Sequence, residues 1–461
     1  MIVLVNPNGR LLRTKDPLSV SPPLGLLYIA AALENKNIPV RIVDALAENL
    51  SQDETLAAII DKRPSHVGFG FVTPQADLCI ELAVRLPRSV TSIAGGPHAS
   101  AIPEATLKAG FDIVVRGEGE ATLPEIMGSA ALSKIRGISY TSNGRPIHTP
   151  DRPRLDPESL PFPARHLIAR GGTDKPYFSD GTQFYPWAPI LTSRGCPYTC
   201  YFCPKDVHGR AYRGRSPENV IREIDHLVET YGIRELIFYD HLFNYDLDRA
   251  EKILDLIIGR DYRLCLRFVN GLRADKVNER LMAKMRQAGA SFVAFGIESG
   301  DPKILRLIPK GETLAQMTRA VRLAKKEGML TAGFFMLGLL GDTVQTMRRT
   351  VHFATSLDLD GINLNIATPY PGTRMERIIK EQGGRILTRK WDDYLTRLGK
   401  LPFRLPGMAS GPDVQAMFKK ALISFYLSPR YLLRHARLVF KPSVYHSLYR
   451  GLLRLLSDLR K

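Results

Sequence analysis

The pattern of apolar and polar positions divides the chain into two regions in which short apolar runs alternate with helical patterns. In the first region, runs rich in Val and Ile predict buried parallel strands at residues 2–6, 40–45, 67–72, 91–95 and 112–116. Helical patterns lie between these runs. The alternation predicts a doubly wound, Rossmann-like α/β domain.

The second region repeats this alternation six times. Its predicted strands are residues 189–192, 235–239, 264–269, 292–297, 331–337 and 361–366. Six strand–helix units predict a partial (β/α)6 barrel of the TIM type, in which functional groups lie at the carboxyl ends of the strands.

The segments outside these two regions have different patterns. Asn143-Gly144 between two apolar runs predicts a hairpin, and residues 150–186, rich in Pro, Gly and Asp, predict an extended linker. After residue 373 we expect a helical region, with helices at 414–427, 429–440 and 445–459.

These patterns predict four parts of the chain. They are an α/β domain at 1–134, a hairpin and linker at 135–187, a partial barrel at 188–373 and a C-terminal helical region at 374–461.

Composition places the chain among ordinary globular proteins. It has 461 residues, of which 44% are hydrophobic and 24% charged. No run approaches the roughly 20 apolar residues that cross a bilayer, and the first residues lack the pattern of a signal peptide. Five cysteines, three of them clustered, do not form a disulfide framework. We therefore expect a cytoplasmic protein.

The net charge of +18 would suit nucleic acid, anionic lipid or an acidic substrate. Much of the excess lies near the C-terminus, where basic residues follow Pro429: Arg430, Arg434, Arg437, Lys441, Arg450, Arg454, Arg460 and Lys461. Two interpretations remain open for these helices. They pack on the barrel with a solvated basic face, or they contact a membrane surface peripherally.

Three of the five cysteines, Cys196, Cys200 and Cys203, lie within eight residues of each other. Soft thiolates bind zinc, copper(I) or iron–sulfur clusters. A structural zinc site normally has four protein ligands in two spaced pairs, and no second pair is present. The spacing therefore favours an iron–sulfur cluster with one open iron. Cys79 and Cys265 are predicted to be small buried hydrophobic residues.

The motif Cys196-Pro-Tyr-Thr-Cys200-Tyr-Phe-Cys203 resembles the signature of the radical SAM superfamily. The resemblance implies a [4Fe-4S] cluster on these cysteines, with S-adenosylmethionine (SAM) chelating the fourth iron and yielding a 5'-deoxyadenosyl radical. It also implies SAM contacts from Phe202 and from the Gly-Ile-Glu298-Ser299 segment. Asp240, at the end of the second barrel strand, is expected either to contact SAM or to form a salt bridge with a neighbouring arginine.

The first region resembles the cobalamin-binding domain of cobalamin-dependent radical SAM proteins. The resemblance rests on Pro22-Pro-Leu-Gly-Leu-Leu-Tyr, Gly95-Gly-Pro-His98 and Val115-Arg-Gly-Glu-Gly-Glu120. It implies cobalamin contacts at strand ends, for which the candidates are Thr73, Gly95, Gly96, His98, Gly117 and Glu118. The first histidine of the chain is His66, so the loop after the first strand cannot supply the cobalt ligand of many other cobalamin enzymes. We expect either cobalamin without a histidine lower ligand or a domain that binds none; His98 is a substitute ligand or a loop hydrogen-bonding residue.

Three functional hypotheses follow from the resemblance. The first is a cobalamin-dependent methyltransferase acting on an unactivated carbon, or a phosphorus, of a small molecule, natural product or lipid. The second is a non-methylating radical SAM cyclase or rearranging enzyme, and the third is a non-catalytic metal- or cobalamin-binding protein. Both enzymes would need an electron donor such as a flavodoxin or ferredoxin. Nucleic acid is not expected, because tRNA methylthiotransferases of this superfamily carry further N-terminal cysteines and this chain has only Cys79 there.

Overall fold

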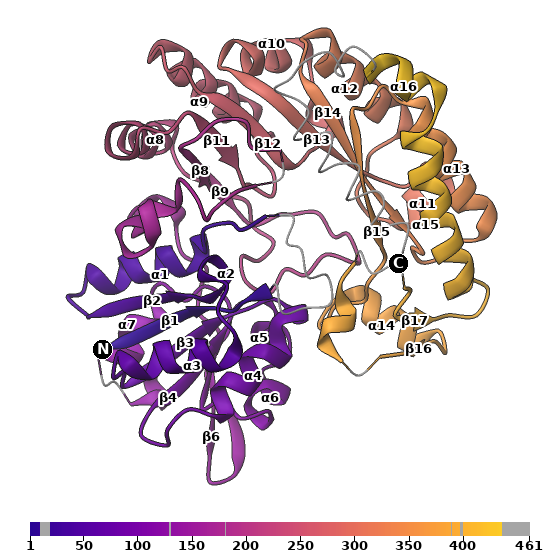
Figure 1. The fold of residues 1–461 in the computed structure, drawn as a ribbon. Coiled ribbons are helices and arrows are strands. Elements are labelled where there is room, and N and C mark those ends of the chain that lie inside the picture. The colour runs from indigo at the N-terminus through magenta and orange to yellow at the C-terminus, as the bar shows by residue number, and fades with distance from the viewer. Residues whose placement is uncertain (10–18, 129–130, 180, 389, 397–399, 436–461) are drawn as a thin grey trace.

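The computed structural model describes residues 1–461 except 10–18, 129–130, 180, 389, 397–399 and 436–461. Its two main parts are an N-terminal sheet domain and a barrel, which lie side by side, with two C-terminal helices along the outer side of the barrel (Figure 1). All eleven predicted strands are present, with ends that differ from the prediction by up to three residues.

The N-terminal sheet has the order β2-β1-β3-β4-β5-β6-β7. Its strands are β1 (Ile2–Asn6), β2 (Val40–Asp44), β3 (His66–Gly70), β4 (Thr91–Gly95), β5 (Ile113–Val115), β6 (Ile138–Ser142) and β7 (Arg145–His148). The first five are parallel, and the order reverses between β1 and β3. Such a switch point is where open α/β sheets bind ligands.

Helices cover both faces of this sheet. They are α1 (Leu24–Glu34), α2 (Ala45–Glu48), α3 (Gln52–Asp61), α4 (Ala76–Val84), α5 (Pro97–Ala101), α6 (Pro103–Lys108) and α7 (Thr122–Met127). Side chains alternate along β1, so Ile2 and Leu4 join the core under α1 and α7, and Val3 and Val5 join the core under α3 and α4. A strand buried on both faces explains the apolar runs without a polar face.

The Asn143-Gly144 hairpin forms as predicted, and β6 pairs with β5 in antiparallel register. Asn143 and Gly144 have φ values of 50° and 73°, as a two-residue hairpin turn requires. The hairpin therefore extends the N-terminal sheet and does not belong to the linker. The linker itself packs on that domain, because the buried hydroxyl of Tyr177 donates to Asp44 at 2.8 Å.

The barrel sheet has the order β15-β14-β13-β12-β11-β8, and all its neighbours are parallel. Its strands are β8 (Trp187–Ile190), β11 (Glu235–Phe238), β12 (Cys265–Leu272), β13 (Ala290–Glu298), β14 (Leu330–Leu337) and β15 (Gly361–Ile366). Its helices are α8 (Pro217–Tyr231), α9 (Leu247–Gly259), α10 (Glu279–Gln287), α11 (Pro302–Leu307), α12 (Leu314–Lys326) and α13 (Val344–Ser356). This sheet is the predicted partial (β/α)6 barrel.

The described part of the region after residue 373 is mainly helical, as predicted, and it also contains a short two-stranded ribbon that the sequence did not predict. Helix α14 (Arg374–Glu381) is followed by a small ribbon of β16 (Arg385–Ile386) and β17 (Phe403–Arg404), and then by α15 (Gly411–Tyr426) and α16 (Pro429–His435). One face of α15, with Val414, Phe418 and Phe425, joins the barrel core. The predicted helix at 445–459, most of the basic C-terminal residues and the proposed membrane contact through them lie outside the described residues.

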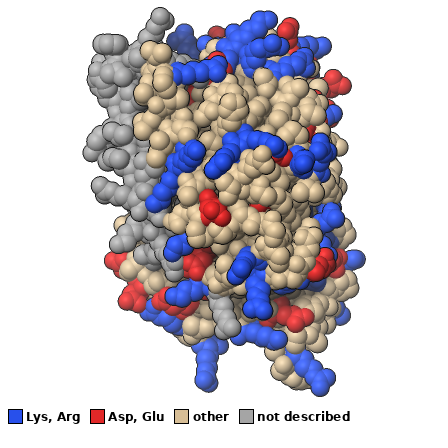
Figure 2. Space-filling model, turned by 90° about the vertical axis from the view of Figure 1, so that its right-hand side faces the viewer, with Lys and Arg blue, Asp and Glu red and all other residues tan. Residues whose placement is uncertain are grey.

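The face that carries α13 and α15 shows basic side chains with acidic side chains between them (Figure 2). No helix within the described part of the chain is both long enough and apolar enough to cross a membrane.

Candidate active site

The three clustered cysteines lie on a loop that a small ribbon closes at its base. Strands β9 (Ser193–Arg194) and β10 (Arg213–Gly214) pair antiparallel, and the loop between them holds residues 195–212. Gly195 begins the loop with a φ of 80°, and a Cβ there would lie 2.0 Å from the carbonyl oxygen of Ala211. Only glycine permits this approach. We call residues 195–212 the cysteine loop.

Asp240 holds the start of the cysteine loop. Its buried carboxylate accepts hydrogen bonds from the backbone N–H of Thr192 at 3.1 Å, from the Thr192 hydroxyl at 2.7 Å and from the Ser193 hydroxyl at 2.5 Å. The sequence placed Asp240 correctly at the end of the second barrel strand. Since its oxygens are already engaged, the predicted SAM contact has no support in this geometry.

The three thiols are partly buried and unpaired. Burial raises the pKa of Cys200 to about 11, and it also raises the pKa of Cys203. The ammonium group of Lys205 lies near the thiols of Cys196 and Cys203 and interacts with both electrostatically. A bound metal would displace their protons, as it does from any coordinating thiol.

Within the described residues, no three His, Cys, Asp or Glu side chains meet closely enough to hold a single metal ion. The cysteine ligands of a four-iron cluster lie farther apart than the ligands of a single metal ion. The three thiolates therefore need not meet at one point. Three partly buried soft donors on one loop, with a cation beside them, are a donor set that fits such a cluster.

Glu298 lies at the carboxyl end of β13 and interacts electrostatically with Cys200 and Cys203. It has a φ of 66°, which is uncommon for a residue other than glycine and typical of functional sites. The ammonium group of Lys310 lies 3.3 Å from its carboxylate and 3.0 Å from that of Glu312. Burial alone would lower the pKa of Lys310, but these two carboxylates outweigh burial and raise it.

The sequence analysis did not single out Lys310. It stands in an exposed-looking Pro-Lys-Gly turn, and no spacing in the sequence connects it with the cysteines. The structure places it beside Cys200 and Glu298, where it supplies a fixed positive charge.

The two other predicted SAM contacts have different surroundings. The Ser299 hydroxyl is buried and bonded to Thr350 at 3.1 Å and to the backbone N–H of Asp301 at 3.1 Å, so both of its partners are structural. Phe202 packs edge-on against Tyr201, with ring centroids 5.4 Å apart, beside the barrel core.

A cavity of about 540 Å³, which we call cavity A, lies between the N-terminal domain and the cysteine loop. Its lining includes strand-end residues of the N-terminal sheet, among them Asn6, Gly70, Gly95, Gly96, Gly117 and Glu118. From the other side it is lined by Cys196, Cys203, His208 and His241. The glycines leave a floor without side chains, which suits a large flat ligand.

Thr73 and His98 are the predicted residues that do not line cavity A. His98 is buried, with its ring 4.7 Å from that of Trp391 and its Nδ1 3.3 Å from the Thr73 hydroxyl. Burial lowers the pKa of His98 to about 4. Of the two sequence alternatives, the geometry favours a hydrogen-bonding residue over a cobalt ligand.

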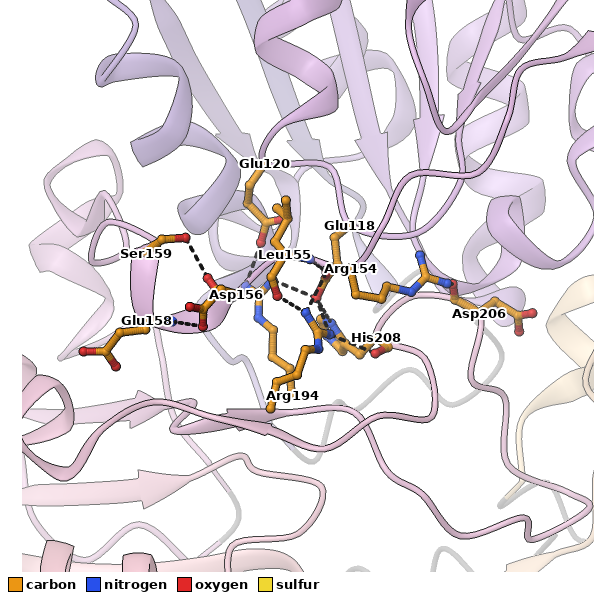
Figure 3. A network of polar contacts seen from close by, with 11 residues as sticks. Glu118, Glu120, Arg154, Leu155, Asp156, Glu158, Ser159, Arg194, Asp206 and His208 are labelled. Carbon is orange, nitrogen blue, oxygen red and sulfur yellow. Dashed lines mark hydrogen bonds and ion pairs between the residues drawn. The ribbon is translucent and has the colours of Figure 1, made fainter.

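Glu118 lines cavity A, but its carboxylate joins the two main parts of the chain (Figure 3). It accepts from Arg194 at 3.2 Å, from Arg213 at 2.9 Å and from the Leu155 backbone N–H at 2.8 Å, and it lies 3.0 Å from His208 Nδ1. Burial alone would raise the pKa of Glu118, but these partners hold it far below its ordinary value. The sequence therefore located this residue correctly but did not predict that it would hold the cysteine loop.

His208 and His241 are cavity residues that the sequence analysis did not assign to cobalamin. Their ring centroids lie 5.8 Å apart. The His241 side chain is exposed where it borders cavity A, and protein surrounds it on its other sides. Its partial burial lowers the pKa of His241 to about 4. Among the described residues that line cavity A, the N-terminal domain supplies no histidine.

Comparison with known proteins agrees with these two parts. A family model of the radical SAM superfamily matches residues 190–354, and one of the B12 binding domain matches residues 14–127. An uncharacterized methyltransferase of Pyrococcus horikoshii is 35% identical over 454 residues, which cover 95% of this chain and 94% of the relative. The chain belongs to the cobalamin-dependent radical SAM family.

More distant relatives differ in their named activities. Cytidylyl-2-hydroxyethylphosphonate methyltransferase of Streptomyces wedmorensis is 28% identical, over 83% of this chain and 82% of that protein. An anaerobic magnesium-protoporphyrin IX monomethyl ester cyclase of Rubrivivax gelatinosus is 25% identical, over 81% of this chain and 68% of that protein.

Two solved structures share the fold. The radical SAM methyltransferase TsrM of Kitasatospora setae aligns with a TM-score of 0.71 at 21% identity, over 90% of both chains. The cobalamin-dependent radical SAM enzyme OxsB aligns with a TM-score of 0.74 at 17% identity, over 99% of this chain and 71% of that chain.

Membership of the family makes the protein a radical SAM enzyme whose cofactors are a [4Fe-4S] cluster, SAM and cobalamin. The glycine floor of cavity A and the thiols in its opposite wall fit these groups. This excludes two hypotheses drawn from the sequence. One was a non-catalytic binding protein, and the other was an N-terminal domain that binds no cobalamin.

Proposed function

We propose that this enzyme is a cobalamin-dependent methyltransferase that modifies an unactivated carbon of a small molecule, natural product or lipid. One observation carries the proposal. Cavity A is walled on one side by the glycine strand ends and on the other by Cys196 and Cys203. The cobalamin of one part and the cluster of the other would therefore face a common space.

When bound, the cluster supplies an electron that cleaves SAM to a radical, and cobalamin supplies a methyl group. The protein contributes position and exclusion of water. Cys196, Cys200 and Cys203 would hold the cluster, and Gly95, Gly96 and Gly117 would leave room for the corrin face. Asp240 would keep the cysteine loop in place.

Glu298 and Lys310 would orient SAM beside the open iron. A carboxylate next to this iron can accept hydrogen bonds from the SAM amino group. The ammonium group of Lys310 lies 3.3 Å from the carboxylate of Glu298 and would help to hold it in position. Phe202, Asp240 and Ser299 remain predicted SAM contacts. Asp240 and Ser299 would have to give up hydrogen bonds to the protein in order to bind SAM, whereas Phe202 would not.

The test uses anaerobically reconstituted enzyme, a chemical reductant, methyl-labelled SAM and a deproteinised extract of the source cells. We expect four irons per chain, 5'-deoxyadenosine, and label in a small-molecule product. Cys200→Ala should lose the cluster and SAM cleavage. Cys265→Ser is the matched control, because Cys265 lies in β12 with its sulfur 3.0 Å from the Ser291 hydroxyl, and should retain both.

A second function, a cyclase or rearranging activity, is kept because a relative is named as a cyclase. Formation of 5'-deoxyadenosine with a converted substrate but no transferred label would establish that activity and exclude methyl transfer. Full SAM cleavage by Cys200→Ala would contradict both enzyme assignments.

We also propose that a flavodoxin or ferredoxin delivers the electron. SAM cleavage should then be supported by reduced flavodoxin or ferredoxin as well as by dithionite. Activity with dithionite and with neither protein would contradict this proposal.

A further inference from the structure

A second cavity, cavity B, adjoins the cysteine loop and is strongly basic. It has a volume of about 520 Å³ and is lined by three segments: the N-terminal domain and linker, the cysteine loop, and the start of α14. Seven of its lining residues are cationic and two are acidic: Arg116, Arg152, Arg154, Lys205, Arg210, Arg374 and Arg377, against Asp151 and Asp206. Bringing seven cations together without a matching set of anions is unfavourable, and a bound anion would relieve this repulsion.

Three of these arginines are available for a ligand. Arg210, Arg374 and Arg377 are exposed, and among the described residues none of them has a carboxylate or carbonyl partner. They come from two segments, since Arg210 lies on the cysteine loop and the other two begin α14. Convergence of separate segments on one space is typical of a binding site and not of a solvated helix face.

Two further arginines, Arg116 and Arg152, each have an N–H group without a hydrogen-bond acceptor among the described residues. Arg116 pairs with Asp151 at 2.6 Å, and Arg152 pairs with Glu125. In both, this group is the buried Nε–H. The protein partners of these two arginines therefore do not use all of their donors.

Arg154 is positioned by two glycines. Its guanidinium group lies over Gly117 and Gly209, where added Cβ atoms would come within 2.0 Å and 3.1 Å of it, and it donates to the Asp206 carbonyl at 2.9 Å. Gly117 thus has a role beyond cavity A, because its missing side chain admits an arginine to cavity B.

Cavity B lies next to the chemistry of the site. Cys200 and Cys203 line it, and it shares Gly117 and residues 203–206 with cavity A. A ligand in cavity B would therefore lie beside both the cluster and the cobalamin.

We infer that cavity B binds a phosphate-type oxyanion. Guanidinium groups bind the oxygens of phosphates and phosphonates in pairs, and the third oxygen and second charge of such a group allow it to engage more arginines than a carboxylate can. Two sources share this chemistry: a phosphate or phosphonate group of the substrate, and the phosphate in the nucleotide loop of cobalamin. The assignment of this group to the substrate rests on the proposed function, whereas the binding of an anion does not.

The test is calorimetric titration of inorganic phosphate and of methylphosphonate into the reconstituted enzyme, with and without cobalamin. We expect the double variant Arg374→Glu/Arg377→Glu to bind both probes at least tenfold more weakly than the unchanged enzyme. The matched control is Arg319→Glu/Arg322→Glu, which reverses two exposed charges on α12 and should bind as the unchanged enzyme does. Equal affinity in both double variants, or no binding by the unchanged enzyme, overturns the inference.

The two sources give different results. If the anion belongs to the substrate, the probes bind equally well with cobalamin present. If it belongs to cobalamin, cobalamin abolishes probe binding and the α14 variant retains less cobalamin. SAM cleavage with dithionite, measured on the same samples, shows separately whether the proposed function holds.

A different result would assign this surface to a protein. If the α14 variant keeps full anion binding and dithionite-driven SAM cleavage but loses flavodoxin-driven cleavage, the arginines serve electron-donor docking and the inference is wrong.

Discussion

At the scale of single residues, the site depends on carboxylates placed among cations. Glu298 lies beside Lys310 near the cysteines, and Glu118 lies among Arg194, Arg213 and His208. The two carboxylates differ in what they hold. Glu118 joins the N-terminal domain to the β9–β10 ribbon. Among the described residues, the carboxylate of Glu298 has only Lys310 as a hydrogen-bonded side-chain partner, and it interacts electrostatically with Cys200.

Replacing Glu298 tests its role in binding SAM. Glu298→Gln keeps the shape but removes the charge, and we expect SAM affinity to fall about tenfold, the size of one charge-assisted hydrogen bond. Equilibrium dialysis with labelled SAM measures this. Glu229→Gln, an exposed position on α8, should leave the affinity unchanged. A Glu298→Gln variant with unchanged affinity and normal iron content would remove Glu298 from the SAM site.

Replacing Glu118 tests the network of Figure 3. Glu118→Gln leaves Arg213 without its carboxylate partner and leaves Arg194 with Glu120 alone, and we expect a loss of about 3 kcal/mol in the free energy of unfolding. The matched change Glu125→Gln affects a pair at the surface and should cost less than about 1 kcal/mol. Urea unfolding of the two variants measures the difference, and similar losses would contradict the buried network.

The same carboxylate predicts a pH dependence. Because the folded protein depresses the pKa of Glu118, its stabilising effect is fully present above the ordinary glutamate pKa of about 4.5 and is lost as the pH falls further. The stability difference between the unchanged protein and Glu118→Gln should therefore be constant from pH 7 to pH 5 and shrink below that. A difference that already shrinks between pH 7 and pH 6 would contradict this assignment to the carboxylate of Glu118.

At the scale of elements, the β9–β10 ribbon and the cysteine loop form one structural unit. Arg194 and Arg213 lie directly opposite each other in the ribbon, where like charges repel. Glu118 bonds to both and so closes the loop only when the N-terminal domain is in place. The cysteine loop is thus stabilised by the domain that its cluster would face.

The glycine that starts the loop provides a prediction at this scale. Gly195→Ala would bring a Cβ against the Ala211 carbonyl at a positive φ, so we expect the loop to shift and the iron content after reconstitution to fall by at least half. Gly259→Ala, in α9 with nothing within 4 Å, is the control and should keep full iron content. Normal iron content in Gly195→Ala would show that the loop tolerates the shift.

At the scale of the whole molecule, cobalamin would bridge the two parts through cavity A. A ligand that binds only the folded state stabilises it by about 2.7 kcal/mol at a hundred times its Kd. Added cobalamin should therefore raise the unfolding temperature in proportion to the logarithm of its concentration.

Filling the cavity floor should remove this effect. An added Cβ at Gly95 meets no atom closer than 4.0 Å, so we expect Gly95→Val to fold normally and to project into the corrin space. We expect its unfolding temperature to be independent of cobalamin. Gly361→Val, a similarly open strand position at the start of β15, should respond as the unchanged protein does. A full response in Gly95→Val would place cobalamin elsewhere.

Local patterns in the sequence were enough to predict both α/β parts, the hairpin and the cysteine cluster. These follow from local rules: period and burial of strands, turn chemistry at Asn143-Gly144, and thiol spacing within one loop. The sequence also located Glu298, Gly95, Gly96 and Gly117 at strand ends, because parallel strands bring their carboxyl ends to one edge.

The contacts of those residues, in contrast, depend on the folded arrangement of the whole chain. Asp240 and Glu118 were predicted to bind cofactors, but their oxygens hold Thr192 and Ser193 in one case and two arginines in the other. Lys310 and the arginines of cavity B carry no motif, since they converge from segments distant in the sequence. A charged group has no fixed partner until the chain folds, whereas strand periodicity and cysteine spacing are already present in the unfolded chain.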